Sequence, residues 1–495
     1  MICVSIGRGR HRHVVLEHQH LVERGAQLVE LRLDYLRTKV NLQRLIEKRP
    51  CPVVIAIRRE QDGGRFKQDE EARQVMLRSA IVAGVEYIDL EGDIAEKIPR
   101  YGKTKRIISY HDFRKTPEDL EAVYDRLAAL DADIVKIATM ANHASDNVRM
   151  LELVQSAKIP TVGMCMGDIG TPSRILCGKF GSPFTYATFN HERALAPGQL
   201  SFDEMRDIYR YDNITAETEI YGVVGDPIGH SLGPLIHNVS FAEQKLDKVY
   251  VPFRVPREDV TDFLRDAPKL GLHGMSVTIP HKSAVIDHIA KIEESAAGVG
   301  AVNTLVHGEG GFVGSNTDFS AAMACLRKAA KERYGKEEDL SGKTALILGS
   351  GGVARAIAFG LHAAGADVVV SGRNTETAEQ LAESVGCGVF EWRERHELDV
   401  EIIVNCTPIG MHPKLDESPY ERQSLGPGMI VFDTVYNPAN TLLLKDAADV
   451  GCHTVSGVDM FIGQAALQYQ LFAGQEPPIK LMRETLARAT SAVKY

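Results

Sequence analysis

Eight short apolar segments, spaced along the first 189 residues, constrain the fold more than any other feature of this chain. Each is rich in β-branched residues, and each is separated from the next by enough residues for a loop and usually a helix. They cover residues 2–6, 28–35, 53–58, 87–92, 106–111, 133–138, 160–167 and 184–189. Strands that alternate with helices form parallel sheets, and eight such strands close into a barrel. We therefore expect an α/β fold that begins with a (β/α)8 barrel.

Polar residues fall where these strands end, which is where the active sites of such barrels lie. They are Glu30, Arg32, Arg58, Glu91, His111 and Lys136. Lys136 lies inside the segment 133–138 (DIVKIA), which otherwise reads as a buried strand. A buried ammonium group is costly unless it is paired or neutral, so this position favours a lowered pKa and a nucleophilic amine. If one face of the strand points inward, Ile134, Lys136 and Ala138 share it. The alternative is a lysine that snorkels from the strand end.

Composition limits the possible partners. The chain has 495 residues, 44% of them hydrophobic and 25% charged, which is more than one ordinary domain with a soluble surface. A net charge of −9 without a long basic block argues against nucleic acid and favours small-molecule ligands. We find no signal peptide and no membrane-spanning run, so we expect a cytoplasmic protein without a membrane partner. The eight cysteines include no CxxC pair, which favours reduced thiols over disulfides or a metal site. The oligomeric state is not predicted.

Breaks in the pattern divide the chain. A polar segment at 213–219 separates the barrel, residues 1–212, from a second α/β unit that begins at Ile220. A further restart near residue 340 indicates two lobes in that unit. We expect a ligand-binding lobe at 220–325, a Rossmann lobe at 326–462 and C-terminal helices at 463–495.

A glycine-rich loop in the second lobe predicts a dinucleotide site. The strand 344–348 leads into the pattern GxGxxA at 349–354, and an amphipathic helix follows. This is the arrangement in which backbone N–H groups and a helix N-terminus receive a pyrophosphate; the alternative is a tight structural turn. The next strand ends in Gly372-Arg373-Asn374-Thr375, where NAD enzymes typically carry an acidic residue. Arg373 offers a cation to a 2′-phosphate, which favours NADP over NAD.

With these motifs in view, residues 1–212 resemble type I 3-dehydroquinate dehydratases. The motif SYHDF (109–113) places His111 as general acid and base, and DIVKIA places Lys136 as the lysine that forms a Schiff base with the substrate ketone. The resemblance adds Asp62 as the carboxylate that orients His111. It also implies that the substrate carboxylate and hydroxyls are held by Glu30, Arg32, Arg58, Arg174 and Gln199.

Residues 219–495 resemble shikimate dehydrogenases. The motifs lie at 225–238, 276–282, 301–304, 316–318, 405–411 and 457–465. The resemblance implies that Lys282 and Asp318 form the catalytic pair. It implies substrate contacts by Ser231, Thr278, Asn303, Tyr436 and Gln464. It also implies NADP contacts by Gly349, Gly351, Gly352, Val353, Ala354, Arg373, Asn374, Thr375 and Gly457.

Four positions depart from these families. Asp62 stands where glutamate is common, and Leu195 stands where a serine precedes Ala196-Pro197-Gly198-Gln199. Gly233 replaces a second serine that binds the substrate carboxylate, which would open space for quinate. Ser276 stands where asparagine is frequent.

The resemblance implies a bifunctional enzyme of the shikimate pathway, and so of aromatic amino acid biosynthesis. It would dehydrate 3-dehydroquinate to 3-dehydroshikimate, a lyase reaction, and then reduce the product to shikimate with NADPH, without a metal. Two alternatives remain: a catabolic dehydrogenase that oxidises quinate or shikimate with NAD, and a non-catalytic regulator that binds pathway metabolites.

Overall fold

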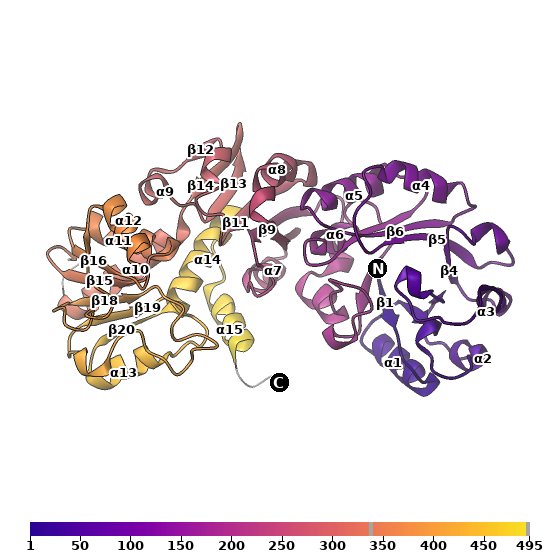
Figure 1. Cartoon of the computed structure of the whole chain (residues 1–495), viewed down its shortest axis with the longest axis horizontal. Helices are drawn as coiled ribbons and strands as arrows, with labels where there is room; N and C mark the ends of the chain where they lie inside the picture. The colour runs from indigo at the N-terminus through magenta and orange to yellow at the C-terminus, as the bar shows by residue number, and fades with distance from the viewer. Residues whose placement is uncertain (336–339, 492–495) are drawn as a thin grey trace. The chain divides into compact units, whose positions relative to one another are not determined.

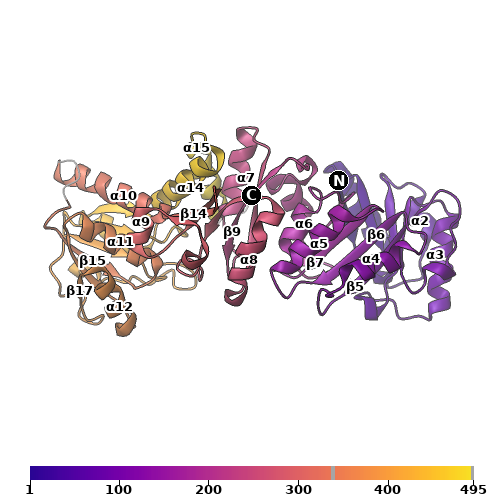
Figure 2. The same cartoon turned by 90° about the horizontal axis from the view of Figure 1, so that it is seen from above.

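The computed structural model describes residues 1–335 and 340–491. The chain divides into two compact units, each described here by itself (Figures 1 and 2). The first consists of residues 1–234 and 247–272, and the second of residues 235–246 and the described part of 273–495.

The predicted barrel opens the first unit. Its eight strands are β1 (Ile2–Ile6), β2 (Leu28–Arg32), β3 (Val53–Ala56), β4 (Tyr87–Glu91), β5 (Lys105–Asp112), β6 (Ile134–Met140), β7 (Thr161–Met166) and β8 (Thr185–Thr188). They follow one another in the order β7-β6-β5-β4-β3-β2-β1-β8, and neighbouring strands run parallel. The predicted fold class is thereby confirmed (Figure 1).

Helices follow most of the barrel strands. They are α1 (His11–Glu23), α2 (Leu42–Ile46), α3 (Glu70–Val82), α4 (Leu120–Ala128), α5 (Ser145–Ser156) and α6 (Thr171–Leu176). Aspartates begin two of them, because Asp69 and Asp119 each accept a hydrogen bond from a backbone N–H of the first turn. Between β4 and β5 the connection contains only a short 3-10 turn, Ala95–Lys97.

The barrel interior is filled by side chains that alternate with outward-facing ones. The buried cluster inside it comprises Cys3, Leu28, Val54, Ile107, Ile134, Ala138, Val162, Met164, Phe184 and Tyr186. Ile134 and Ala138 belong to this cluster, as the alternation along residues 133–138 predicted. Lys136 lies between them on the same strand face.

The rest of the first unit begins after a 3-10 turn, Tyr211–Asn213. Strand β9 (Glu219–Gly225) pairs in parallel with β10 (Lys248–Arg254), and α8 (Val260–Asp266) follows. The predicted linker at 213–219 therefore ends where β9 starts. Helix α7 (Gly233–Glu243) lies between β9 and β10 in sequence.

The second unit contains an antiparallel arrangement and a Rossmann sheet. Strands β11 (Leu272–Val277), β13 (Thr304–Gly308) and β14 (Gly311–Ser315) pair antiparallel in that order, and the short β12 (Lys291–Ile292) pairs with β14. Helix α9 (Glu294–Val299) precedes β13.

The Rossmann sheet consists of β15 (Thr344–Leu348), β16 (Asp367–Ser371), β17 (Gly388–Val389), β18 (Ile402–Asn405), β19 (Ile430–Asp433) and β20 (His453–Ser456). All neighbours are parallel, and the order is β17-β16-β15-β18-β19-β20. This is the 3-2-1-4-5-6 order of dinucleotide-binding folds, with the switch point between β15 and β18.

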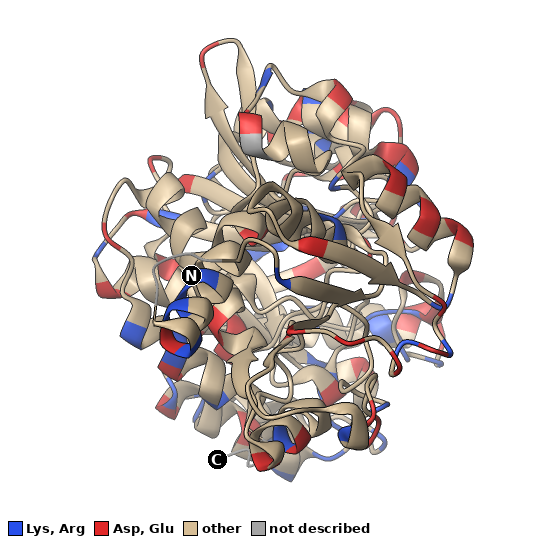
Figure 3. Cartoon of the chain, turned by 90° about the vertical axis from the view of Figure 1, so that its left-hand side faces the viewer, with Lys and Arg blue, Asp and Glu red and all other residues tan. Residues whose placement is uncertain are grey.

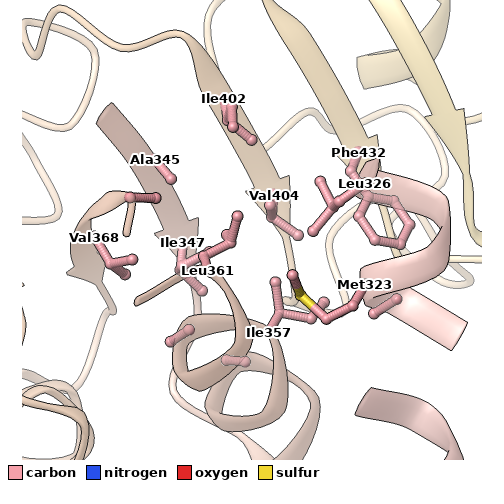
Figure 4. Packing of buried hydrophobic residues seen from close by; sticks show 14 of the residues in the cluster. Met323, Leu326, Ala345, Ile347, Ile357, Leu361, Val368, Ile402, Val404 and Phe432 are labelled. Carbon is pink, nitrogen blue, oxygen red and sulfur yellow. The ribbon is translucent and has the colours of Figure 1, made fainter. Parts of the chain in front are cut away.

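Helices cover the Rossmann sheet and bury its core. They are α10 (Thr317–Tyr334), α11 (Gly352–Ala363), α12 (Thr375–Val385), α13 (Leu442–Val450) and α14 (Gly457–Ala473). The last helix, α15 (Ile479–Thr490), packs against α14. Figure 4 shows Met323 and Leu326 of α10 packed with Ile357 of α11 and Phe432 of β19.

Two predicted boundaries fall inside helices. The boundary between 325 and 326 lies within α10, and the one between 462 and 463 lies within α14. The domain limits 1–212, 220–325, 326–462 and 463–495 stay predictions.

Charged residues of both signs are spread along the helices and loops in Figure 3. Within the described ranges, no helix is long and apolar enough to cross a membrane.

Candidate active sites

Lys136 lies in the interior of the barrel, on β6. Its side chain is 6% exposed, and it lines a pocket together with Glu30, Arg58, His111 and Arg174. The snorkelling alternative is therefore wrong. The predicted burial of Lys136 is confirmed, whereas a neutral amine at this position stays a prediction.

Two carboxylates hold the amine of Lys136. Its Nζ lies 3.0 Å from Oδ2 of Asp89 and 3.4 Å from Oε1 of Glu30, and both acids are buried. Burial alone would raise the pKa of Asp89, but the charges of Arg58 and Lys136 hold it well below its usual range. Glu30 is fixed by the hydroxyl of Ser5, which donates to its Oε2 at 2.7 Å. The amine of Lys136 is therefore held between two buried acids.

Arg58 links Asp89 to His111. Its guanidinium donates to Oδ2 of Asp89 at 2.7 Å and lies 3.1 Å from Nδ1 of His111. Burial lowers the pKa of His111 well below its ordinary value, and the cations of Arg58 and Lys136 add to this effect. His111 is therefore neutral near pH 7 and able to accept a proton.

Arg174 is a buried cation without a carboxylate partner among the described residues. Within the described ranges, its side chain donates only to the sulfur of Met164 and the carbonyl of Pro197, and its Nε has no hydrogen-bond partner. Burial lowers its pKa to about 10. An unpaired buried guanidinium in a polar pocket fits an anionic ligand group such as a carboxylate.

The other predicted residues of the barrel site line the same pocket. Arg32 is already engaged, because it donates two hydrogen bonds of 2.9 Å to Asp34. The amide oxygen of Gln199 accepts from the backbone N–H groups of Leu195 and Ala196, which folds the loop before it. Gln199 therefore shapes this loop in the ligand-free structure.

Two departures from the family motif have structural consequences. Asp62 pairs with Nε of Arg59 at 2.5 Å, and the hydrogen bond at Nδ1 of His111 comes from Arg58. Leu195 also lines the pocket, and a Cβ atom on Gly7 would lie only 2.7 Å from its side chain. Where the family has a serine hydroxyl, this chain therefore has an apolar side chain in the pocket wall.

In the second unit, the predicted pair Lys282 and Asp318 is in contact. Nζ of Lys282 lies 2.5 Å from Oδ2 of Asp318, and both side chains are partly exposed. Asp318 lies in the first turn of α10, whose N-cap Asn316 accepts from the N–H of Phe319. A Cβ on Gly352 would lie 3.7 Å from Cδ of Lys282, so the lysine lies beside the dinucleotide loop.

Asn303 is buried behind this pair. Its amide donates to the hydroxyl of Thr317 at 2.9 Å and accepts from the N–H of the same residue at 2.7 Å. The carboxamide of Gln468 joins this group, because it accepts from Ser276 and donates to Thr304. Ser276 therefore helps to build the support of Asn303.

The remaining predicted substrate contacts are dispersed. Thr278 is half-buried in the loop that follows β11. Gln464 donates to the carbonyl of Phe461, whose ring lies 4.4 Å from that of Tyr436. Burial raises the pKa of Tyr436, so its hydroxyl stays protonated.

Ser231 and Gly233 belong to the first unit. The hydroxyl of Ser231 accepts from the N–H of Gly233 at 3.2 Å. A Cβ on Gly233 would lie 3.2 Å from the ring of Tyr250 and 3.4 Å from its hydroxyl oxygen. The phenol of Tyr250 therefore borders the space that Gly233 leaves open. This limits the space that we expected to accommodate quinate.

The loop after β15 fits a dinucleotide. Gly349 has φ +110°, which favours glycine, and a Cβ there would lie 3.0 Å from the carbonyl of Cys406 at the switch point. Gly351 is the N-cap of α11 and provides no side-chain cap, and no atom lies within 4 Å of a Cβ built on it. The space beside the N-cap of α11 is therefore open, as pyrophosphate binding at a helix N-terminus requires.

The end of β16 fits the ribose side of the same cofactor. Arg373 is exposed, and Asn374 caps α12 by accepting from the N–H of Thr377. Thr375 is the first residue of that helix, and Val353 and Ala354 lie in the first turn of α11. The buried hydroxyl of Ser371 has no hydrogen-bond partner. Gly457, the last predicted cofactor contact, is packed tightly against the backbone. A Cβ at this position would overlap the carbonyl oxygen of Val435.

Several residues of the barrel site were missed by the sequence reasoning. Asp89 holds Lys136, Ser109 donates to Asp89 at 2.6 Å, and Tyr186 lies against the lysine. Asp89 was detectable, because it is a charge inside a buried strand, as Lys136 is. Tyr186 gave no such signal, since a tyrosine in a strand is ordinary.

Family models match nearly the whole chain. The model described as type I 3-dehydroquinase matches residues 2–216, and the shikimate dehydrogenase substrate binding domain matches residues 223–305. A model described as coenzyme F420-dependent NADP oxidoreductase matches residues 343–435, and the shikimate 5'-dehydrogenase C-terminal domain matches residues 457–487.

Known proteins are similar over the same regions. A shikimate dehydrogenase (NADP(+)) of Methanopyrus kandleri is 39% identical over 55% of this chain and 97% of its own length. A crystal structure of a shikimate dehydrogenase in complex with NADP+ matches with a TM-score of 0.51 at 34% identity, over 56% of this chain and 98% of that chain. A chloroplastic bifunctional 3-dehydroquinate dehydratase/shikimate dehydrogenase of Arabidopsis thaliana is 34% identical over 99% of this chain and 84% of the relative. This chain therefore belongs to the family of bifunctional 3-dehydroquinate dehydratase/shikimate dehydrogenases.

Proposed function

We propose that the chain converts 3-dehydroquinate to 3-dehydroshikimate in its barrel and reduces that product to shikimate with NADPH in its second half. The observation that supports this most is the barrel pocket, in which a buried lysine, a neutral histidine and an unpaired arginine line one cavity. A ketone that carries a carboxylate matches these three groups. The family relatives named for both activities support the same pairing.

In the barrel, the amine of Lys136 attacks the substrate ketone. Neutral His111 accepts protons that the attacking nitrogen sheds and relays them to the carbinolamine oxygen, which leaves as water. The resulting iminium acidifies the adjacent carbon. His111, neutral again, then removes a proton from that carbon and donates it to the hydroxyl beyond, which leaves as water. Hydrolysis of the iminium frees Lys136 and the product.

Arg174 orients the substrate by pairing with its carboxylate. Arg32 and Arg58 are already paired with Asp34 and Asp89, so Arg174 is the cation that an incoming anion can neutralise at the lowest cost. Burial of the charge excludes water and strengthens this pairing.

In the second half, Lys282 delivers a proton to the oxygen of the ketone as it is reduced. Asp318, 2.5 Å away, orients the lysine. NADPH, when bound at the glycine loop, supplies the hydride. Arg373 would hold its 2′-phosphate, and the N-terminus of α11 its pyrophosphate.

We also propose that the chain has the predicted domain limits and acts in the cytoplasm. The eight cysteines are all free thiols, which suits a reducing compartment. The Arabidopsis thaliana relative is named as chloroplastic, so localisation of a tagged chain in its own cells is the test.

Two crossed variants test the two activities. Lys136→Ala should lose turnover of 3-dehydroquinate and keep reduction of added 3-dehydroshikimate, whereas Lys282→Ala should do the reverse. A coupled assay follows the loss of NADPH absorbance from either substrate. Loss of both activities in either single variant would contradict this division of labour.

The same assay separates the alternatives. Faster turnover of quinate with NAD than of shikimate with NADP would identify a catabolic dehydrogenase. Binding of both substrates without any turnover would identify a regulator.

A further inference from the structure

Tyr186 is the one aromatic side chain in direct contact with the amine of Lys136 among the described residues. Nζ of Lys136 lies 3.9 Å from the centre of the Tyr186 ring, within the range of a cation–π contact. On strand β8, Tyr186 pairs in register with Cys3 of β1, and both side chains point into the barrel. The ring therefore forms part of the pocket wall that surrounds the amine.

The hydroxyl of Tyr186 is buried and has no hydrogen-bond partner among the residues that the structure describes. The side chain as a whole is only 3% exposed, and the charges of Glu30, Asp89 and Arg58 act on its phenol. Burial, followed by the charge of Glu30, raises the pKa of this phenol well above its ordinary value, so it remains a donor. A buried donor without an acceptor is unfavourable unless a ligand or water supplies one.

Filling the barrel does not require this hydroxyl. Phe184 lies two residues earlier, on the same face, with its ring 5.6 Å from that of Tyr186 and 1% exposed. Phenylalanine therefore serves as filler at the neighbouring position. At 186 the chain carries a phenol, and the phenol lies in the pocket that holds the lysine.

We infer that Tyr186 is a further residue of the dehydratase site: its ring holds the cationic nitrogen of Lys136, and its hydroxyl donates to an oxygen of the bound substrate. The inference rests on the proposed role of Lys136. The face of the Tyr186 ring contacts the lysine nitrogen, which is an ammonium before the reaction and an iminium during it. Asp89 lies beside the same nitrogen. Aromatic rings favour a desolvated cation over a neutral nitrogen, so the ring stabilises the intermediate that the proposed chemistry needs.

Three variants separate this role from packing. Tyr186→Phe keeps the ring and removes the hydroxyl, and Tyr186→Leu removes both. Phe184→Leu removes a neighbouring ring that, in the part of the chain that the structure describes, makes no cation–π contact with Lys136. Reduction of added 3-dehydroshikimate by the second half of the same chain serves as the internal control for folding. Thermal unfolding of all three variants measures the cost to packing.

For Tyr186→Leu we expect kcat of dehydration and the rate of borohydride trapping to fall by roughly tenfold. For Tyr186→Phe we expect near-normal trapping and a KM for 3-dehydroquinate that rises by about fivefold or more, as loss of one hydrogen bond to substrate predicts. Phe184→Leu should lower thermal stability and leave kcat and KM near those of the parent chain.

Equal effects of Tyr186→Leu and Phe184→Leu on kcat, or parental KM and kcat in Tyr186→Phe, would overturn the inference, because the phenol would then be filler. Failure of the proposed function looks different. In that case Lys136→Ala itself would keep dehydratase activity and the parent chain would give no trapped adduct.

Discussion

Single charged residues carry the chemistry of the barrel, and Arg174 differs from the others because it is buried without a carboxylate partner among the described residues. A buried unpaired charge destabilises the ligand-free protein and is neutralised only when an anion binds. We therefore expect Arg174 to lower the stability of the ligand-free protein and to strengthen the binding of an anionic substrate.

Arg174→Met should show this trade directly. We expect the KM for 3-dehydroquinate to rise by about 10- to 100-fold, because a charge-assisted hydrogen bond is lost. The free energy of unfolding of the ligand-free chain should rise by about 1 kcal/mol, because the desolvated charge is gone. Kinetics and denaturant unfolding measure the two effects. A variant that loses stability without any change in KM would show that Arg174 is structural.

Buried histidines should make the stability of the fold depend on pH. Burial lowers the pKa of His18 to about 4 and that of His237 to about 3, and it lowers the pKa of His111 as well. Below about pH 6.5 the unfolded chain binds protons that these folded residues do not. Stability should therefore fall as the pH is lowered from about 6.5 toward 4.

His18→Gln tests this assignment. It should reduce the acid slope of the free energy of unfolding by up to about 1.4 kcal/mol per pH unit, the value for one proton. The exposed His13 provides the control, since His13→Gln should leave the slope unchanged. Equal slopes in both variants would contradict the assignment.

Among the elements, β6 and β15 could be predicted well, because their sequences carry local signals. A lysine inside an apolar strand marked Lys136, and the glycine spacing after a strand marked Gly349 and Gly352. The partner of His111 could not be predicted, because Arg58 reaches it from another strand in a contact that only the closed barrel creates. The predicted boundary at 325/326 lies within α10, which carries Asp318 in its first turn.

We expect the loop between β16 and α12 to set the cofactor preference. Arg373→Asp would place a carboxylate where NAD enzymes typically carry one. We expect the ratio of kcat/KM for NADPH over NADH to fall by about 100-fold, through loss of a cation and gain of a repulsive charge. Arg488→Asp on the exposed face of α15 is the matched control. An unchanged ratio in Arg373→Asp would mean that another residue reads the 2′-phosphate.

In the molecule as a whole, the second half of the sequence contributes to the barrel. Asp259 accepts from the N–H of Ala144 and pairs with Nδ1 of His143 at 3.1 Å, in the loop that directly follows β6. That strand carries Lys136, so a residue from beyond the barrel sequence anchors the exit of the catalytic strand.

This contact predicts a pH effect opposite to that of the buried histidines. Its hydrogen bond to Asp259 raises the pKa of His143. The pair should therefore stabilise the fold below about pH 6.5, and this contribution should be lost as the pH rises through the raised pKa. Since His143 is largely exposed, the effect is small.

Asp259→Asn keeps the hydrogen bond to Ala144 possible and removes the charge. It should reduce stability at pH 5.5 more than at pH 8, as measured by thermal unfolding at both values. His143→Gln should mimic it. A larger loss at pH 8 would contradict the ion pair.

The central claim is that Lys136 forms a covalent bond with the substrate ketone. Incubation with 3-dehydroquinate and borohydride, followed by proteolysis and mass spectrometry, tests it most directly. The account predicts one reduced adduct per chain, on the peptide that contains Lys136, and none in Lys136→Ala. An active chain that gives no adduct, or an adduct on another lysine, would contradict it.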